Sequence, residues 1–100
     1  IRNTRINYIK MDTYAVTSTL NKAISYKIPP NCALDFELGY NNKIECKIID
    51  GECEYNGYPL TTNNVYNFNK YGGVGLISWH GCELTLNGTF KSKPILLYNN

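Results

Sequence analysis

Apolar and polar residues alternate with a period of two through the middle of the chain. The segments at 32–38, 44–48, 52–55 and 82–86 follow this pattern. Because successive side chains of a β-strand point to opposite faces, each segment predicts a strand with one buried and one exposed face. Free cysteine behaves as a small buried hydrophobe, so we expect four structural thiols. They lie on the apolar face of these segments at Cys32, Cys46, Cys53 and Cys82.

Turn signals separate these segments. Three dipeptides tolerate the positive φ angles of tight turns: Asp50-Gly51, Asn56-Gly57 and Asn87-Gly88. Each lies between two strand-like segments, so we expect three hairpins, the last of which joins ELTL to TFKS. Further strand-like runs start at Ala23, Val65, Gly73, Thr89 and Ile95.

The pattern predicts an all-β domain, a small antiparallel β-sandwich of about eight short strands. One hundred residues provide one hydrophobic core, which we assign to residues 23–100. Residues 1–22 are an N-terminal arm or edge segment, in which YAVTSTL fits an edge strand and IRNTRINYIK fits a short helix or a frayed arm. No apolar run approaches the roughly 18 residues of a membrane span, and the first residues lack a signal peptide. We therefore expect an intracellular protein without membrane contact.

Composition narrows the candidate functions. The chain has 43% hydrophobic and 18% charged residues and a net charge of +2, which is typical of a folded domain. No basic groove interleaved with aromatic residues is visible, which disfavours direct RNA binding. The cysteines form no C-x-x-C pair, so we expect no zinc site.

The segment Trp79-His80-Gly81-Cys82 is the strongest candidate for chemistry. A thiol nucleophile needs a base within hydrogen-bond reach. Here, however, a glycine separates His80 from Cys82, at a point where one strand ends and the next begins. We expect His80-Gly81 to form a structural corner, Cys82 to point inward and Trp79 to cap the core, so that the segment has no catalytic residue.

Three other motifs have structural explanations. Asn87-Gly88-Thr89 matches a glycosylation sequon, but Asn87-Gly88 also suits a hairpin. The segment YGGVG from Tyr71 lacks the Lys-Ser/Thr pair of a P-loop and runs into a strand. Five acidic residues fall on outward faces, where a solvated surface is expected: Asp35, Glu37, Glu45, Glu52 and Glu54.

A family resemblance makes the prediction more specific. ALDFEL, DGECEYNGYPL, VYNFN, SWHGCELTLNG and KPILLYNN occur in this order between residues 33 and 100. They resemble the N-terminal β-sandwich domain of the family that contains the pre-mRNA cleavage complex II subunit and related polynucleotide 5′-hydroxyl kinases. The signature is most specific at Trp79, His80, Gly81 and Cys82. Pro59 replaces the glutamate of the G-T-E-L piece of that family.

The resemblance implies a noncatalytic domain within a larger nuclear protein. In the family, the sandwich precedes a P-loop domain that binds ATP and Mg²⁺, so we expect a P-loop beyond Asn100. The parent would take part in mRNA 3′-end cleavage and polyadenylation with the subunits of that complex and would contact RNA only indirectly through this segment. Some family members phosphorylate RNA 5′-hydroxyls.

The family's sandwich also contacts adenine through an acidic residue and a lysine. At these places the chain has Ala33 and the glycines Gly72 and Gly73. Lys70 and Asp35 lie nearby and are the candidate nucleotide-binding residues.

Two alternatives remain open from the residues alone. One is a free-standing interaction module that binds a protein partner through a sheet edge or a tyrosine-rich face. The other is an extracellular adhesion sandwich, which predicts disulfides and a glycan on Asn87.

Overall fold

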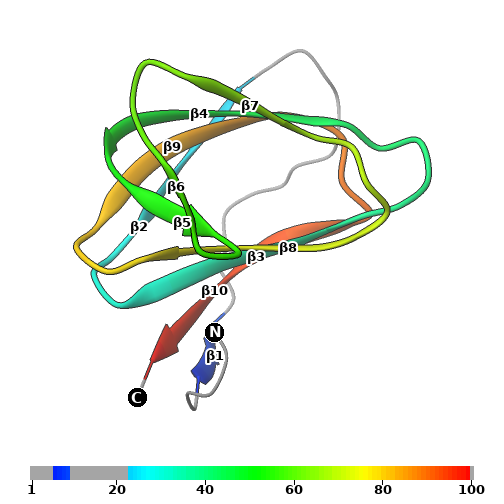
Figure 1. Cartoon of the computed structure of the whole chain (residues 1–100). Helices are drawn as coiled ribbons and strands as arrows, with labels where there is room; N and C mark the ends of the chain where they lie inside the picture. Colours follow the sequence, from blue (N-terminus) through cyan, green and yellow to red (C-terminus); the bar gives the residue numbers. More distant parts are fainter. Residues whose placement is uncertain (1–5, 10–22, 100) are drawn as a thin grey trace.

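The computed structural model describes residues 6–9 and 23–99 and contains ten strands in two layers (Figure 1). They are β1 (Ile6–Ile9), β2 (Ile24–Ile28), β3 (Cys32–Leu38), β4 (Ile44–Gly51), β5 (Cys53–Tyr55), β6 (Tyr58–Leu60), β7 (Val65–Phe68), β8 (Gly72–Ser78), β9 (Cys82–Gly88) and β10 (Ser92–Asn99). The described part of the chain holds no helix long and apolar enough to cross a membrane.

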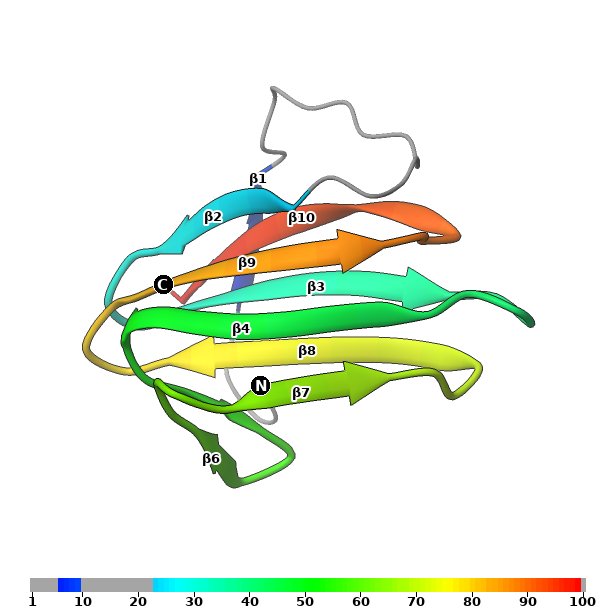
Figure 2. The same cartoon turned by 90° about the horizontal axis from the view of Figure 1, so that it is seen from above.

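The strands form two antiparallel sheets packed face to face. One sheet has six strands in the order β1-β10-β3-β8-β5-β6, and the other has four in the order β2-β9-β4-β7. Seen from above, the central strands of both layers run roughly along one direction, as in an aligned sandwich, whereas β1 and β6 run across them (Figure 2). The predicted antiparallel β-sandwich is therefore confirmed.

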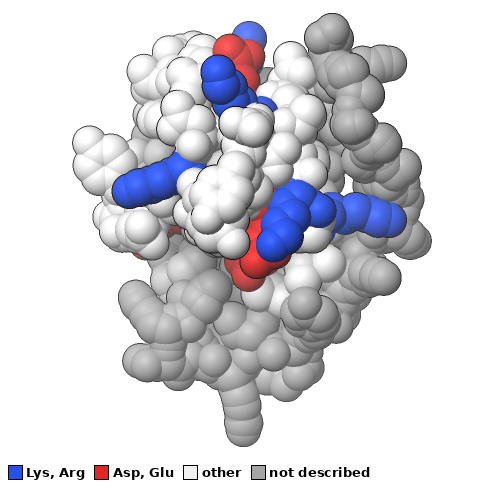
Figure 3. All heavy atoms as spheres, turned by 90° about the vertical axis from the view of Figure 1, so that its right-hand side faces the viewer, with Lys and Arg blue, Asp and Glu red and all other residues white. Residues whose placement is uncertain are grey.

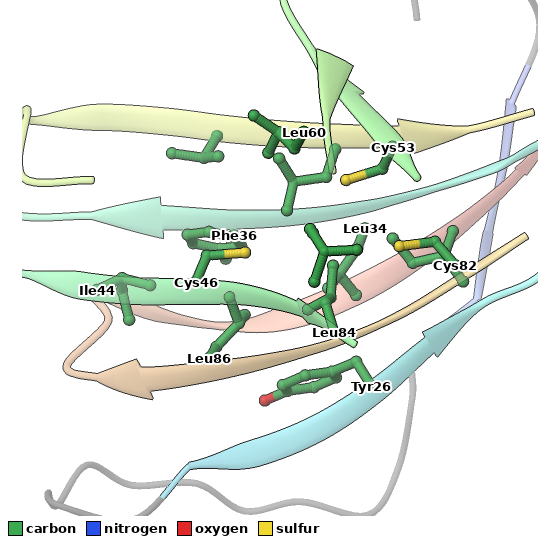
Figure 4. Packing of buried hydrophobic residues seen from close by; sticks show 14 of the residues in the cluster. Tyr26, Leu34, Phe36, Ile44, Cys46, Cys53, Leu60, Cys82, Leu84 and Leu86 are labelled. Carbon is green, nitrogen blue, oxygen red and sulfur yellow. The ribbon is translucent and has the colours of Figure 1, made fainter. Parts of the chain in front are cut away.

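The core lies between the inward faces of the two sheets (Figure 4). Leu34 and Leu76 of the larger sheet and Leu84 and Cys46 of the smaller one have no exposed surface. Phe36 extends this core with an edge-to-face contact to Phe90, at a centroid distance of 5.4 Å. The alternation seen in the sequence thus marks the inward face of each strand.

The cysteines lie where the pattern predicts. All four are buried, and all four are free thiols. An extracellular adhesion sandwich would be expected to contain disulfides, so the four free thiols contradict the main prediction of that alternative.

Only one of the three predicted hairpins exists. Asn56 and Gly57 have φ angles of 50° and 81° and join β5 to its neighbour β6. By contrast, Gly51 and Gly88 are the last residues of β4 and β9, and after each the chain passes to the other sheet. Positive φ angles also suit the bend by which a strand leaves its sheet, so the dipeptides at 50–51 and 87–88 mark sheet crossings.

The ends of the chain add detail that the pattern did not supply. Residues 6–9, for which a helix was considered, form β1 and pair with β10 at the edge of the larger sheet. YAVTSTL lies outside the described residues. The expected strand TFKS is mostly connection, since β10 begins at Ser92.

The crossing at Gly88 generates a stability prediction. Gly88 has φ +144°, and a Cβ there would collide with the Lys43 carbonyl oxygen and lie 3.0 Å from the Ile44 Cα. We expect Gly88→Ala to lower the free energy of unfolding by about 2–4 kcal/mol, measured by urea denaturation.

Gly73→Ala is the matched control, because nothing lies within 4 Å of the position of its Cβ. Its effect should stay within about 0.5 kcal/mol. Equal effects of the two substitutions would show that the crossing at Gly88 is not tightly packed.

Candidate functional site

The segment from Trp79 to Gly81 is the corner by which the chain passes from β8 to β9. Gly81 has φ 103°, which favours glycine. Ser78 fixes the corner: its fully buried hydroxyl donates a hydrogen bond to the Glu52 carbonyl oxygen at 3.0 Å and accepts one from the Gly81 N–H at 2.9 Å. The sequence analysis did not single out Ser78. Its place at an inward, otherwise apolar position of the strand was nevertheless a signal of a buried polar side chain.

Cys82 belongs to the core and forms no dyad with histidine. Its side chain is 8% exposed, and the structure gives the exposed His80 ring no hydrogen bond to it. Instead, Cys82 is hydrogen-bonded to Cys53 across the two sheets, and this bond together with burial raises the pKa of Cys53. Burial likewise raises the pKa of Cys46 to about 12. The same hydrogen bond lowers the pKa of Cys82. Cys46 and Cys53, whose thiols stay neutral, are therefore poor nucleophiles.

Trp79 does not cap the core. Its side chain is 48% exposed, because the chain has already turned outward after the inward-facing Ser78. The expectation for Trp79 was therefore wrong, whereas the structural corner at His80-Gly81 is confirmed.

The exposed Trp79 lies instead in an open cleft of about 940 Å³ at this end of the sandwich. Cys53, His80 and Lys27 also contribute to its wall. The remaining charged residues of the wall are acidic: Asp50, Glu52, Glu54 and Glu83. The cleft is thus strongly negative. Among the described residues, no group of three or more His, Cys, Asp or Glu side chains could hold a metal ion.

The nucleotide candidate Asp35 lies on the outward face of the six-stranded sheet. It pairs with Gly75, where a Cβ would be 2.9 Å from the Asp35 Oδ1, so the carboxylate leans over the glycine. Burial raises the pKa of Asp35. A half-buried carboxylate is the kind of group that marks a binding site.

The structure keeps apart the positions that correspond to the family's two adenine contacts, and Lys70 lies outside the strand that pairs with Asp35. Ala33 pairs with Ile77 near one end of the β3–β8 ladder, and Gly73 pairs with Glu37 near the other, a separation of about 14 Å along the strands. Lys70 is exposed in the loop before β8. The geometry therefore leaves Asp35 and Lys70 as separate groups.

Comparison with known proteins decides the family. Residues 27–98 match the family model of the N-terminal β-sandwich domain of polyadenylation factor. The chain belongs to this family. The polyribonucleotide 5′-hydroxyl-kinase Clp1 of Bos taurus is 30% identical over 81 residues, and so is the mRNA cleavage and polyadenylation factor clp1 of Botryotinia fuckeliana over 80 residues.

This sandwich domain corresponds to a small part of those relatives. Each match covers 75% of the chain but only 19% of the bovine protein and 17% of the fungal one. A solved structure of an extended interface between Pcf11p and Clp1p superposes with a TM-score of 0.72 over 82% of the chain and 20% of its own. At 18% identity, this likeness supports the sandwich fold of the family.

Ser78 supplies a prediction about the corner of the sandwich domain. Ser78→Ala removes the partner of both the Glu52 carbonyl oxygen and the Gly81 N–H. We expect a loss of about 1–3 kcal/mol in the free energy of unfolding, measured by urea denaturation. Ser25→Ala on the exposed side of β2 is the control and should be nearly neutral. Equal losses would argue against Ser78 as the fixing point.

Asp35 supplies a prediction about pH. Because its folded-state pKa is raised, its contribution to stability is present below the unfolded value of 3.8 and is lost as pH rises through the folded value. Asp35→Asn should therefore stabilise the domain at pH 7, by less than about 1 kcal/mol because the group is partly solvated. Thermal unfolding should show this gain shrinking as pH falls through the raised folded-state pKa toward 3.8. A gain independent of pH would contradict the assignment.

Proposed function

We propose that the chain is the noncatalytic N-terminal domain of an ATP-binding mRNA 3′-end processing factor related to polynucleotide 5′-hydroxyl kinases. The domain packs on a downstream P-loop domain, close to its nucleotide. Family membership supports this assignment, and so does the fraction of its relatives that the chain covers, since about four fifths of their length lies outside the match. A nuclear location and contact with subunits of the cleavage and polyadenylation complex belong to the same proposal.

The observation that carries the proposal is the outward face of the six-stranded sheet. Along β3 and β8 this face carries the small or apolar residues Ala33, Gly73, Gly75 and Ile77, of which Ala33 is buried. Two carboxylates lie on the same face, the half-buried Asp35 and the exposed Glu37. Apolar residues continue the face on β10: Ile95 and the buried Leu97. A face with so few large side chains lets another domain approach closely, and a carboxylate within it suits the amino group of a base.

The phosphates and Mg²⁺ are assigned to the downstream domain. The chain contains no G-x-x-x-x-G-K-[ST] segment to surround phosphates. Its own contribution to nucleotide binding is therefore limited to the base, through Asp35. Lys70 lies in the loop before β8, five positions before Gly75, the partner of Asp35, and is given no part in this contact.

The test uses the full-length protein and ATP. Asp35→Asn should weaken ATP binding about tenfold or more in calorimetric titration, because it exchanges a charged hydrogen-bond acceptor for a neutral amide. GTP affinity should change less if the base is what Asp35 contacts.

Glu45→Gln is the matched control, since Glu45 lies on β4 in the opposite sheet and should leave ATP affinity unchanged. Unaltered ATP binding by Asp35→Asn would show that this face is not next to the nucleotide. A full-length protein lacking a P-loop domain would defeat the proposal as a whole.

A free-standing protein-interaction module is the second candidate. The exposed Trp79 in its acidic cleft favours it, because exposed aromatic groups are enriched in protein interfaces. The two candidates differ in the size of the cellular product: an immunoblot showing a product of about 100 residues alone would favour the module.

A further inference from the structure

Two exposed tyrosines stack on each other at the end of the sandwich opposite the Trp79 corner. Tyr40 lies in the β3–β4 loop and Tyr71 in the β7–β8 loop. Figures 1 and 2 both place these loops at the same end of the molecule. The ring centroids are 4.3 Å apart with an interplanar angle of 15°. Tyr40 is 76% and Tyr71 55% exposed, so the pair presents open aromatic surface to solvent.

The loop that carries Tyr40 is held in place before any ligand arrives. The Gly39 N–H donates to Asn42 Oδ1 at 2.7 Å, and Asn42 Nδ2 donates to Thr89 Oγ1 at 2.9 Å. The Thr89 N–H in turn donates to the Lys43 carbonyl oxygen at 3.0 Å. Loops distant in sequence are thus clamped together, which lowers the entropic cost of binding on Tyr40.

Lysines surround the tyrosine pair. Lys91 runs beside Gly39 and places its Nζ 6.0 Å from the centroid of the Tyr71 ring. Three more exposed lysines come from the same loops and from the start of β10: Lys43, Lys70 and Lys93. Figure 3 views the molecule from this end and shows blue side chains around an uncharged patch, with red groups beside some of them at the top and below the centre.

Charge is therefore separated along the domain. Among the described residues, the tyrosine end has four exposed lysines against Glu37 and Glu45, whereas the cleft at the Trp79 corner has four carboxylates against Lys27. An anionic ligand is attracted to the tyrosine end and repelled from the other.

We propose that Tyr40, Tyr71 and the four lysines form a binding platform for a single-stranded polynucleotide. A base stacks on the solvent-facing side of Tyr40, and the lysines bind the adjacent phosphates. Flat aromatic faces with flexible cations fit a strand with unstacked bases better than a duplex, which hides its bases. The platform goes beyond the proposed function, since it gives this segment a contact with the polynucleotide that does not pass through a P-loop domain.

The test is fluorescence anisotropy of the 100-residue chain with labelled RNA and DNA single strands of about eight nucleotides, with the blunt RNA duplex as competitor. Tyr40→Ala should weaken single-strand binding about fivefold to 100-fold, and Tyr40→Phe should retain it, because stacking needs the ring and not the hydroxyl. The two labelled strands show whether the sugar matters.

Tyr58→Ala is the matched control, since Tyr58 is 65% exposed at the start of β6 and has no place in the platform. It should leave affinity unchanged. Circular dichroism checks that each variant is folded; Tyr40→Phe also keeps the ring in place, so it separates stacking from folding.

Salt supplies an independent measurement. Lys91→Ala should reduce the slope of log affinity against log salt concentration by about 0.7, the contribution of one phosphate contact on a single strand. The proposal is overturned if Tyr40→Ala binds as well as the unaltered chain, if duplex RNA competes as strongly as the single strand, or if no binding occurs at low salt.

Discussion

The contact between the inward faces of the two sheets is the interaction on which this domain depends. The described part has no helix to cover either sheet, and its four cysteines form no disulfide, so the hydrophobic contact across the sandwich holds the layers together. Leu34, Leu76 and Leu84 have no exposed surface. The cysteines fill smaller spaces in the same layer, where burial raises the pKa of Cys46 and Cys53. The exposed aromatic and charged groups lie at the ends and on the outer faces.

Both ends of the sandwich consist of segments that change sheets or reverse direction. The two ends differ in the charge of their described side chains. At the corner, buried hydrogen bonds to Ser78 leave Trp79 outward in an acidic cleft. At the other end, the Asn42 and Thr89 side chains hold a loop that displays a tyrosine among lysines. In each case a fixed backbone supports an exposed aromatic ring, which is the arrangement expected of a surface for binding.

The strands could be predicted from the sequence because burial of one face imposes a local period of two, visible within any five or six residues. The partners across the sheets could not. Gly51 and Gly88 have the positive φ that a hairpin needs, but the same angle serves a crossing, and only the pairing of β4 with β9 distinguishes them. The tyrosine platform was hidden for a related reason: its residues are spread over three loops and the start of β10, and no short window of sequence contains them together. Reasoning from the residues located the corner at His80-Gly81 but gave Trp79 the wrong environment.

The separation of charge has one more physical consequence. The described charges, positive at one end and negative at the other, contribute an electric dipole, on which a highly charged neighbour exerts a torque before contact. Near a polyanion the domain would rotate until its lysines lead and its tryptophan cleft faces away. Any protein that docks in that cleft would then be held on the far side, so the domain could act as an oriented spacer between the two.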